Sequence, residues 1–135
     1  MQRLTREDYP ALQRFYRGAG YRGRPGADER SLALREDGAI RAALRLSPLD
    51  NGWWLRGFWV APACRGQGLG SRLLAALPAH LDGRACYCFA YPEAQRFYQA
   101  GGFRPLTVEA LPPGLAQRLR RYHVKTPELV PMLIP

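Results

Sequence analysis

Alternating apolar and polar positions predict a run of strands in the first half of the chain. SLALRE and AIRAALRL flank Asp37-Gly38, and this dipeptide favours the left-handed conformations of a tight hairpin turn. A second turn signal, Asp50-Asn51-Gly52, precedes the apolar run WWLRGFWVA. The pattern therefore predicts three strands in a meander, over residues 31–36, 39–47 and 53–61.

Helical spacing of apolar residues predicts helices on both sides of this meander. The N-terminal helix has Thr5 as its N-cap, Asp8 at its third position and an apolar stripe of Leu12, Phe15 and Tyr16. A second helix follows a glycine-rich loop and is ended or kinked by Pro78; its stripe is Leu69, Leu73, Leu74 and Leu77.

The second half of the chain alternates short strands with helices. The expected order is a strand at Ala85–Ala90, the helix PEAQRFYQA closed by Gly101-Gly102, a strand at 103–108, an amphipathic helix after Pro112-Pro113, and the strand ELVPMLI. We place this last strand at a sheet edge because Pro131 has no N–H to donate. The length predicts a single domain over residues 1–135.

Charge and cysteine content narrow the function classes. The net charge of +9 favours an anionic partner, which leaves nucleic acid, an anionic membrane surface and a phosphorylated small molecule open. No run reaches the ~18 apolar residues of a membrane span, and the first residues lack the apolar core of a signal peptide. The three cysteines show no zinc spacing, so we expect no metal site and a reducing, cytoplasmic location.

The most informative stretch is CRGQGLGSRLL, residues 64–74, where three alternate glycines precede the second helix. A helix N-terminus carries free N–H donors and a partial positive charge, and glycine lets a phosphate approach the main chain closely. Arg65 and Arg72 add formal charge beside it. The loop therefore predicts an anion site; a tight turn without ligand is the alternative.

Two common phosphate motifs do not fit this loop. The dinucleotide pattern G-x-G-x-x-G fails because its sixth position falls on Ser71 or on Leu73. The nucleoside triphosphate loop requires a Gly-Lys-Ser/Thr sequence, and the stretch contains no lysine. The residues thus favour a phosphate-bearing ligand of another type.

Arg65-Gly66-Gln67-Gly68-Leu69-Gly70 resembles the acyl-CoA motif Arg/Gln-x-x-Gly-x-Gly/Ala of the GNAT N-acetyltransferase superfamily. The approach FWVAP, the paired strands SLALREDGAIRAALRLS and the helix EAQRFYQAGGF are also similar to that family, over about residues 1–108. The resemblance implies an α/β (α+β) GNAT fold. Its mixed, largely antiparallel twisted sheet would have six or seven strands, flanking helices, and splayed fourth and fifth strands.

The resemblance also implies a site for acetyl-CoA. Main-chain N–H groups of Gln67 through Arg72 would hold the pyrophosphate, and the main chain of Phe58, Trp59 and Val60 would pair with the pantetheine arm. The Val60 N–H would polarise the thioester carbonyl. Where the family often carries an Asn that contacts pantetheine, this chain has Tyr91. The full donor-binding set implied is Phe58, Trp59, Val60, Arg65, Gly66, Gln67, Gly68, Leu69, Gly70, Ser71, Arg72 and Tyr91.

Tyr98 matches the family's tyrosine near the thioester sulfur, the candidate acid for the departing thiolate. A phenol pKa of about 10 exceeds a thiol pKa of about 8.5, so a hydrogen bond is favoured over full proton transfer. The amine acceptor must itself lose a proton before it attacks in a ternary complex. The general base is left open among Glu36, Glu93, Glu109, His80 and His123.

Several alternatives stay open. The donor could carry a longer acyl chain, or the chain could be a CoA sensor without catalysis. A nucleic-acid module is disfavoured because no helix-turn-helix or aromatic RNA-binding signature is present. We expect a small-molecule or peptide amine as acceptor, bound between loop 18–29 and the C-terminal segment.

Four further features of the sequence have more than one interpretation. The loop 21–30 is read as a connector or as a lid, and Arg118, Arg120 and Arg121 as a solvated face or an anion-attracting one. We expect the tryptophans to be mainly core, with one lining the acceptor pocket. The tail ELVPMLIP either closes the sheet or pairs across a homodimer.

Overall fold

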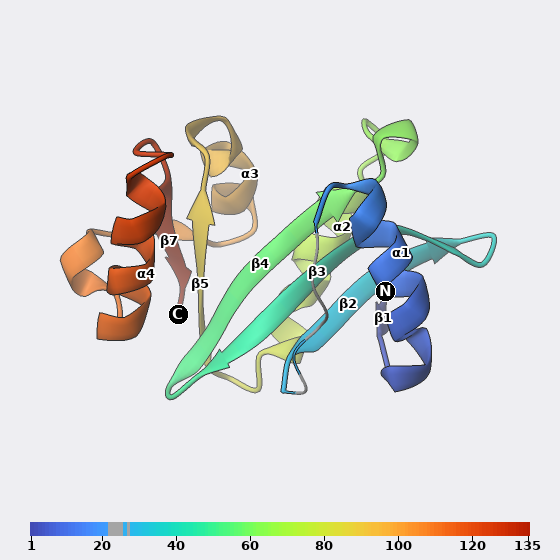
Figure 1. Ribbon diagram of the computed structural model, residues 1–135, viewed down its shortest axis with the longest axis horizontal. Helices are drawn as coiled ribbons and strands as arrows, with labels where there is room; N and C mark the ends of the chain where they lie inside the picture. The colour runs from blue at the N-terminus through green and yellow to red at the C-terminus, as the bar shows by residue number, and fades with distance from the viewer. Residues whose placement is uncertain (22–25, 27) are drawn as a thin grey trace.

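The computed structural model describes residues 1–21, 26 and 28–135 and contains a seven-stranded sheet (Figure 1). The strand order is β1-β2-β3-β4-β5-β7-β6, and only the β4–β5 pair is parallel. This confirms the mixed, largely antiparallel sheet. The strands are β1 Gln2–Arg3, β2 Arg30–Glu36, β3 Ala39–Leu49, β4 Gly52–Val60, β5 Ala85–Ala90, β6 Arg104–Pro105 and β7 Val130–Ile134.

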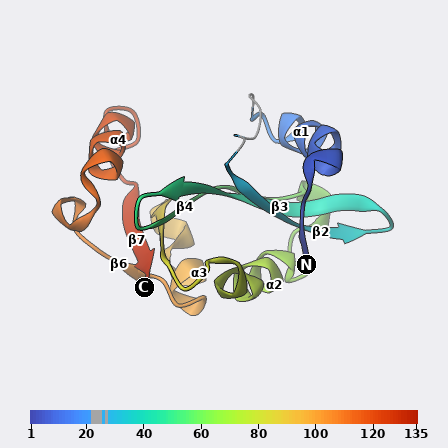
Figure 2. The same ribbon diagram turned by 90° about the horizontal axis from the view of Figure 1, so that it is seen from below.

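The helices cover both faces of this sheet. Helices α1 and α4 lie on one face, and α2 and α3 lie on the other (Figure 2). The main helices are α1 Tyr9–Gly18, α2 Leu69–Ala76, α3 Gln95–Ala100 and α4 Pro113–His123. Pro78 acts as expected, since α2 ends at Ala76 and a 3-10 turn continues to His80.

The predicted N-terminal cap is also present. The Thr5 N–H donates to Asp8 Oδ2 at 2.9 Å, and a 3-10 turn, Arg6–Asp8, leads into α1. Residues 22–25 and 27 lie outside the described residues, so the structure leaves the connector and lid interpretations of loop 21–30 untested.

Strand alternation divides the apolar residues between two layers. The face towards α2 buries Leu44, Leu46, Trp53 and Leu55 together with Cys86 and Cys88. The opposite face carries Ala43 under α1, and Trp54 under α4. Most of the tryptophan side chains are therefore core, as the alternation predicts.

Strands β4 and β5 separate along their length, as expected. Their pairing covers only Gly52–Trp54 against Ala85–Tyr87. From Leu55 onwards the β5 side of β4 has no partner strand among the described residues, while β5 pairs on its other side with β7. The main chain at the end of β4 therefore borders an open gap.

A bulge in β4 changes which face its last residues occupy. Arg56 pairs with Arg45 and Trp59 pairs with Ala43, so Gly57 and Phe58 together oppose the single residue Leu44. Gly57 has a φ of +63°, in the left-handed region. The bulge shifts the alternation by one, so Phe58 and Val60 pack with the α2-side core and Trp59 packs under α1.

The last strands differ from the sequence-based expectation. The strand expected at 103–108 is only two residues long, because the chain turns into a 3-10 helix at Val108–Ala110. Strand β7 is not an edge strand: it lies between β5 and β6. The N–H and C=O of one residue in an antiparallel strand point to the same side. The Pro131 carbonyl accepts from the Leu106 N–H, so the side on which Pro131 lacks a donor also faces the point where β6 ends. The β5–β7 ladder is thus left intact. The β1–β2 pairing was not expected from the sequence.

Candidate functional site

The glycine loop joins the end of β4 to α2 through left-handed backbone. Gly66 has a φ of +81° and Gly68, the N-cap residue of α2, a φ of +77°. Side-chain-bearing residues rarely adopt this region, so glycine is required by the backbone itself. Apart from the adjoining residues of the loop, no atom of the described residues lies within 4 Å of a Cβ built at either position, so the space beside both residues is open.

The third glycine has a different reason. Gly70 has an ordinary φ, but a Cβ there would lie 3.4 Å from Phe97 and 3.5 Å from Val60. Its lack of a side chain lets the first turn of α2 approach β4 and α3 closely. Gly70 thus brings the start of α2 against the end of β4.

The main-chain N–H groups of residues 66–71 have no acceptor within the described part of the chain. They border a cavity of about 200 Å³ whose lining includes Val60, Arg65 and Ser71. The Arg72 N–H donates to the Gly68 carbonyl at 3.0 Å. Of the expected set, Gln67 through Arg72, the Arg72 N–H is thus already bonded, while the Gly66 N–H, outside that set, has no acceptor among the described residues.

Arg65 is directed back towards β4. Its Nε donates to the Val60 carbonyl at 3.2 Å, and its guanidinium lies 4.5 Å from the Trp59 ring centroid. The side chain therefore fixes the end of β4 against the loop. Gln67 and Arg72 are exposed, so their side chains reach solvent beside the same loop.

The Val60 N–H faces the gap between β4 and β5. The next residue, Ala61, donates its N–H to the Arg41 carbonyl of β3 at 2.7 Å. Successive N–H groups of a strand point to opposite edges, so the Val60 N–H points away from β3. A donor at this position can polarise a carbonyl that enters the gap.

Tyr98 of α3 lies against the same region. Its ring centroid is 6.1 Å from that of Phe58 and 5.5 Å from that of Phe103. Burial raises the pKa of Tyr98 well above its usual value, and the neighbouring Cys88 thiol adds to the rise. The phenol is therefore protonated at every ordinary pH and can act as a hydrogen-bond donor.

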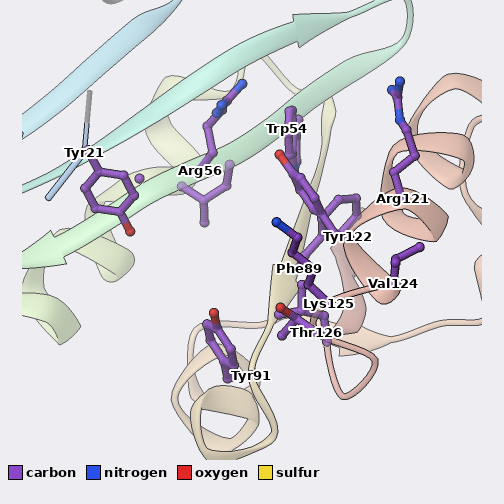
Figure 3. Close-up of a pocket in the computed structure, with 13 residues that line it drawn as sticks. Tyr21, Trp54, Arg56, Phe89, Tyr91, Arg121, Tyr122, Val124, Lys125 and Thr126 are labelled. Carbon is purple, nitrogen blue, oxygen red and sulfur yellow. The ribbon is translucent and has the colours of Figure 1, made fainter. Parts of the chain in front are cut away.

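A cavity of about 580 Å³ lies between β4, β5 and the segment that follows α4 (Figure 3). Aromatic rings of Trp54, Phe89 and Tyr122 form much of its wall, and Tyr91 stands at its rim, 49% exposed. Its charged lining residues are all cations: Arg56, Arg121 and Lys125. Among the residues described there, no carboxylate or imidazole lines it.

None of the five candidate bases lines this cavity in the described structure. His123 Nε2 lies 2.9 Å from the Leu129 carbonyl, a local contact after α4. Burial lowers the pKa of His80, whose carbonyl accepts from Arg30 at 2.9 Å near the opposite end of the sheet. Glu36, Glu93 and Glu109 are exposed. The general base is therefore not assigned.

The sequence analysis did not select Arg56, which lines this cavity. The signal was present, since Arg56 is the only charged residue within the apolar run WWLRGFWV. Arg118 also differs from a purely solvated residue, because its guanidinium lies 4.8 Å from the Trp54 ring centroid. The sequence gives no signal that Lys125 lines this cavity, because the residues around it match no motif.

Within the described ranges, no group of three or more His, Cys, Asp or Glu could hold a metal ion. No helix in the same ranges is long and apolar enough to cross a membrane.

Comparison with known proteins gives a family match. The model of the "Acetyltransferase (GNAT) domain" matches residues 27–105. No curated protein sequence matches the chain.

Solved structures share the fold at low identity. N-acetylglutamate synthase from Neisseria gonorrhoeae, complexed with coenzyme A and N-acetyl-glutamate, is 18% identical with a TM-score of 0.73, over 98% of this chain and 34% of that chain. This chain thus spans about a third of that synthase. The ribosomal-protein-S18-alanine N-acetyltransferase of Escherichia coli is 19% identical with a TM-score of 0.72, over 99% and 91% of the two chains. Escherichia coli ElaA is 20% identical with a TM-score of 0.62, over 82% and 70%.

Proposed function

The chain belongs to the GNAT acetyltransferase family, and from this membership we propose that it transfers an acetyl group from acetyl-CoA to a primary amine. The acceptor amine, on a small molecule or a peptide, attacks the thioester directly in a ternary complex. Two structures with this fold have coenzyme A bound, the Neisseria synthase and an aminoglycoside 6'-N-acetyltransferase, which supports the choice of donor.

The observation that carries the proposal is the run of main-chain amides at residues 66–71 without acceptors in the described structure. Amides at the start of a helix hold anions through hydrogen bonds and the helix dipole. The pyrophosphate of acetyl-CoA supplies oxygens to these donors. The open space beside Gly66 and Gly68 leaves room for it.

The pantetheine arm lies along the unpaired side of β4, where Phe58–Val60 have no β5 partner. This adds an extended chain to an exposed strand edge, a common mode of recognition. The thioester carbonyl then meets the Val60 N–H, which stabilises the negative charge that develops on its oxygen. Tyr98, held neutral by burial, donates a hydrogen bond to the departing thiolate.

The amine enters from the cavity between β4 and α4. Since no carboxylate or imidazole lines the described part of that cavity, its proton leaves through water. The rate is therefore expected to rise with pH until the acceptor amine is neutral, without a plateau set by a protein group near neutrality.

Calorimetry with coenzyme A tests donor binding. Gly68→Glu places a carboxylate beside the phosphate site and should weaken coenzyme A binding by more than about tenfold. Gly83→Glu is the matched control: Gly83 has a φ of +70°, nothing lies within 4 Å of its Cβ position, and it precedes β5 at the other end of the sheet. Equal affinities for the two variants would contradict the proposal.

A CoA sensor without catalysis is the second candidate, because the described cavity lacks a carboxylate or imidazole base. Release of free thiol from acetyl-CoA separates the two functions. Thiol release that depends on an added amine supports the transferase. Binding of acetyl-CoA with no turnover over a broad amine panel selects the sensor.

A further inference from the structure

Two arginines stand directly opposite each other on neighbouring strands, and one of them, Arg56, lines the cavity of about 580 Å³. Arg45 of β3 pairs with Arg56 of β4 across the antiparallel ladder, so their side chains share the α4 side of the sheet. Like charges at directly opposite positions destabilise a sheet. Arg45 is offset by Glu29, whose Oε2 lies 3.2 Å from Arg45 Nε.

Arg56 has no such partner. The ion pairs between described residues are Arg30–Asp82, Arg35–Asp8 and Arg45–Glu29. The five residues outside the description are Arg22, Gly23, Arg24, Pro25 and Ala27, and none of these has a carboxylate. Among the described residues, Arg56, Arg118 and Lys125 therefore form no ion pair with a carboxylate of this chain.

Other cations lie near Arg56. Arg56 and Arg118 lie 4.5 and 4.8 Å from the Trp54 ring centroid. Figure 3 shows Lys125 and Tyr122 extending their polar ends from the α4 side towards β4, where Arg56 lies, while Arg121 points away from them. Burial, and then the charge of Arg45, lowers the pKa of Arg56. A half-buried cation among other cations is costly unless an anion joins it.

Building on the proposed transferase activity, we propose that the acceptor is a small amine that also carries an anionic group, a carboxylate or a phosphate. Arg56 and Lys125 bind the anionic group, and Trp54 and Phe89 contact the body of the molecule. A cavity of about 580 Å³ has the size of a small-molecule site.

The same charges exclude a class of acceptors. A polyamine carries several positive charges, and Arg56 and Lys125 repel them because the described wall of this cavity offers no carboxylate. The basic side chains therefore select against polycationic amines as well as for anionic ones.

Matched pairs of amines test the proposal with acetyl-CoA and wild-type protein. Each pair differs by the anionic group alone: 4-aminobutyrate against propylamine, phenylalanine against phenethylamine, and O-phosphoethanolamine against ethanolamine. We expect the anionic member of at least one pair to have a kcat/KM about tenfold or more above its neutral partner, when kcat/KM is calculated for the neutral form of each amine at the same pH. The carboxylate and phosphate arms separate the two sources of charge. Spermidine is expected to be a poor acceptor.

Lys125→Gln and Arg56→Gln should each reduce this preference by about tenfold, with coenzyme A affinity unchanged. Lys125 is exposed, so its variant carries the test if Arg56→Gln fails to fold. Arg120→Gln is the matched control, because it removes the same charge from exposed α4 without lining the cavity. Titration of the preferred anionic amine into the protein–coenzyme A complex gives the same comparison without turnover.

The outcomes separate the two proposals. If the wild-type protein does not bind coenzyme A, or if no added amine changes either thiol release or binding, the proposal of a transferase is wrong. If the protein binds coenzyme A but prefers neutral amines or spermidine as acceptors, the proposal of an anionic acceptor is wrong and the proposal of a transferase is unaffected. If no amine is turned over, failure of every anionic amine to bind the coenzyme A complex overturns the acceptor proposal as well.

Discussion

Tyr98 combines a phenol held neutral by burial with a position beside the β4–β5 gap. Tyr98→Phe removes the hydroxyl and keeps the ring, which packs against Phe58 and Phe103. We expect kcat to fall by roughly 5- to 100-fold, because the thiolate loses one hydrogen bond as charge develops on it. Acetyl-CoA affinity should stay close to that of the wild type in calorimetry.

Tyr9→Phe, on α1, is the control and should leave kcat unchanged. Because the pKa of Tyr98 is raised, its ionisation should cause no alkaline fall in the wild-type rate below about pH 10. An unchanged kcat in Tyr98→Phe would remove the proposed role.

Asp8 makes a pH-dependent contribution to stability. The Thr5 N–H, and also Arg35, holds the pKa of the Asp8 carboxyl below its usual range. A lowered native pKa means that the contribution is present above the unfolded value of about 3.9 and is lost as pH falls through the native value. Asp8→Asn should therefore lower the thermal midpoint by a few degrees at neutral pH.

The difference between Asp8→Asn and wild type should shrink in strong acid, where both side chains are uncharged. Glu7→Gln, the neighbouring exposed carboxylate, should show a smaller pH-dependent change. A constant difference between Asp8→Asn and wild type across the acid range would contradict this linkage.

At the scale of elements, the β4 bulge sets the direction of the Val60 N–H. Tyr16 donates to the Gly57 carbonyl at 2.7 Å, and a Cβ on Gly57 would lie 3.2 Å from the Tyr16 hydroxyl. Gly57→Ala adds this contact to the strain of a φ of +63°. We expect a lower free energy of unfolding and a kcat reduced about tenfold, because the oxyanion donor is displaced.

Gly38→Ala gives the reference for backbone strain alone. Gly38 has a φ of +80° with nothing within 4 Å of its Cβ position, in the β2–β3 turn. It should cost about 1–2 kcal/mol and leave kcat unchanged. Urea unfolding and steady-state rates are measured for both variants. Equal losses of stability and of kcat in Gly57→Ala and Gly38→Ala would contradict the proposed effect of the bulge on the Val60 N–H.

Elements with local signals were predictable from the sequence. The Asp37-Gly38 turn fixed β2 and β3 within a few residues, and β5 was predicted with its observed bounds. Elements that depend on distant partners were not. The lengths of β6 and the interior position of β7 depend on their pairing with each other, which no local pattern encodes. The β4 bulge likewise needs Tyr16 to bind the Gly57 carbonyl.

At the scale of the whole molecule, the donor and acceptor sides of the candidate site differ in predictability. The glycine loop and Tyr98 belong to motifs that lie within short stretches of sequence. The proposed acceptor cavity unites Arg56 of β4 with Lys125 beyond α4, and only the folded chain brings these residues together. The positions of the donor residues follow the resemblance, and their roles stay predictions.

The three cysteines report on the integrity of the fold. Cys64, Cys86 and Cys88 are free and buried, and burial raises the pKa of Cys86 to about 12. We expect Cys86 and Cys88 to resist alkylation in the native protein at mildly alkaline pH, because the reactive species is the thiolate. Mass spectrometry along a urea series should show both sites modified together with global unfolding. Modification of either before unfolding would contradict this expectation.

The interior position of β7 has a consequence for biosynthesis. While the ribosome has released only the residues before Val130, β5 presents a bare edge and the short β6 has nothing to join. The sheet cannot close until Val130–Ile134 has emerged, and an uncovered strand edge invites association between nascent chains. The five residues of β7 therefore complete the sheet by pairing with β5 and β6, and their emergence ends the period in which the nascent chain exposes the edge of β5 to association.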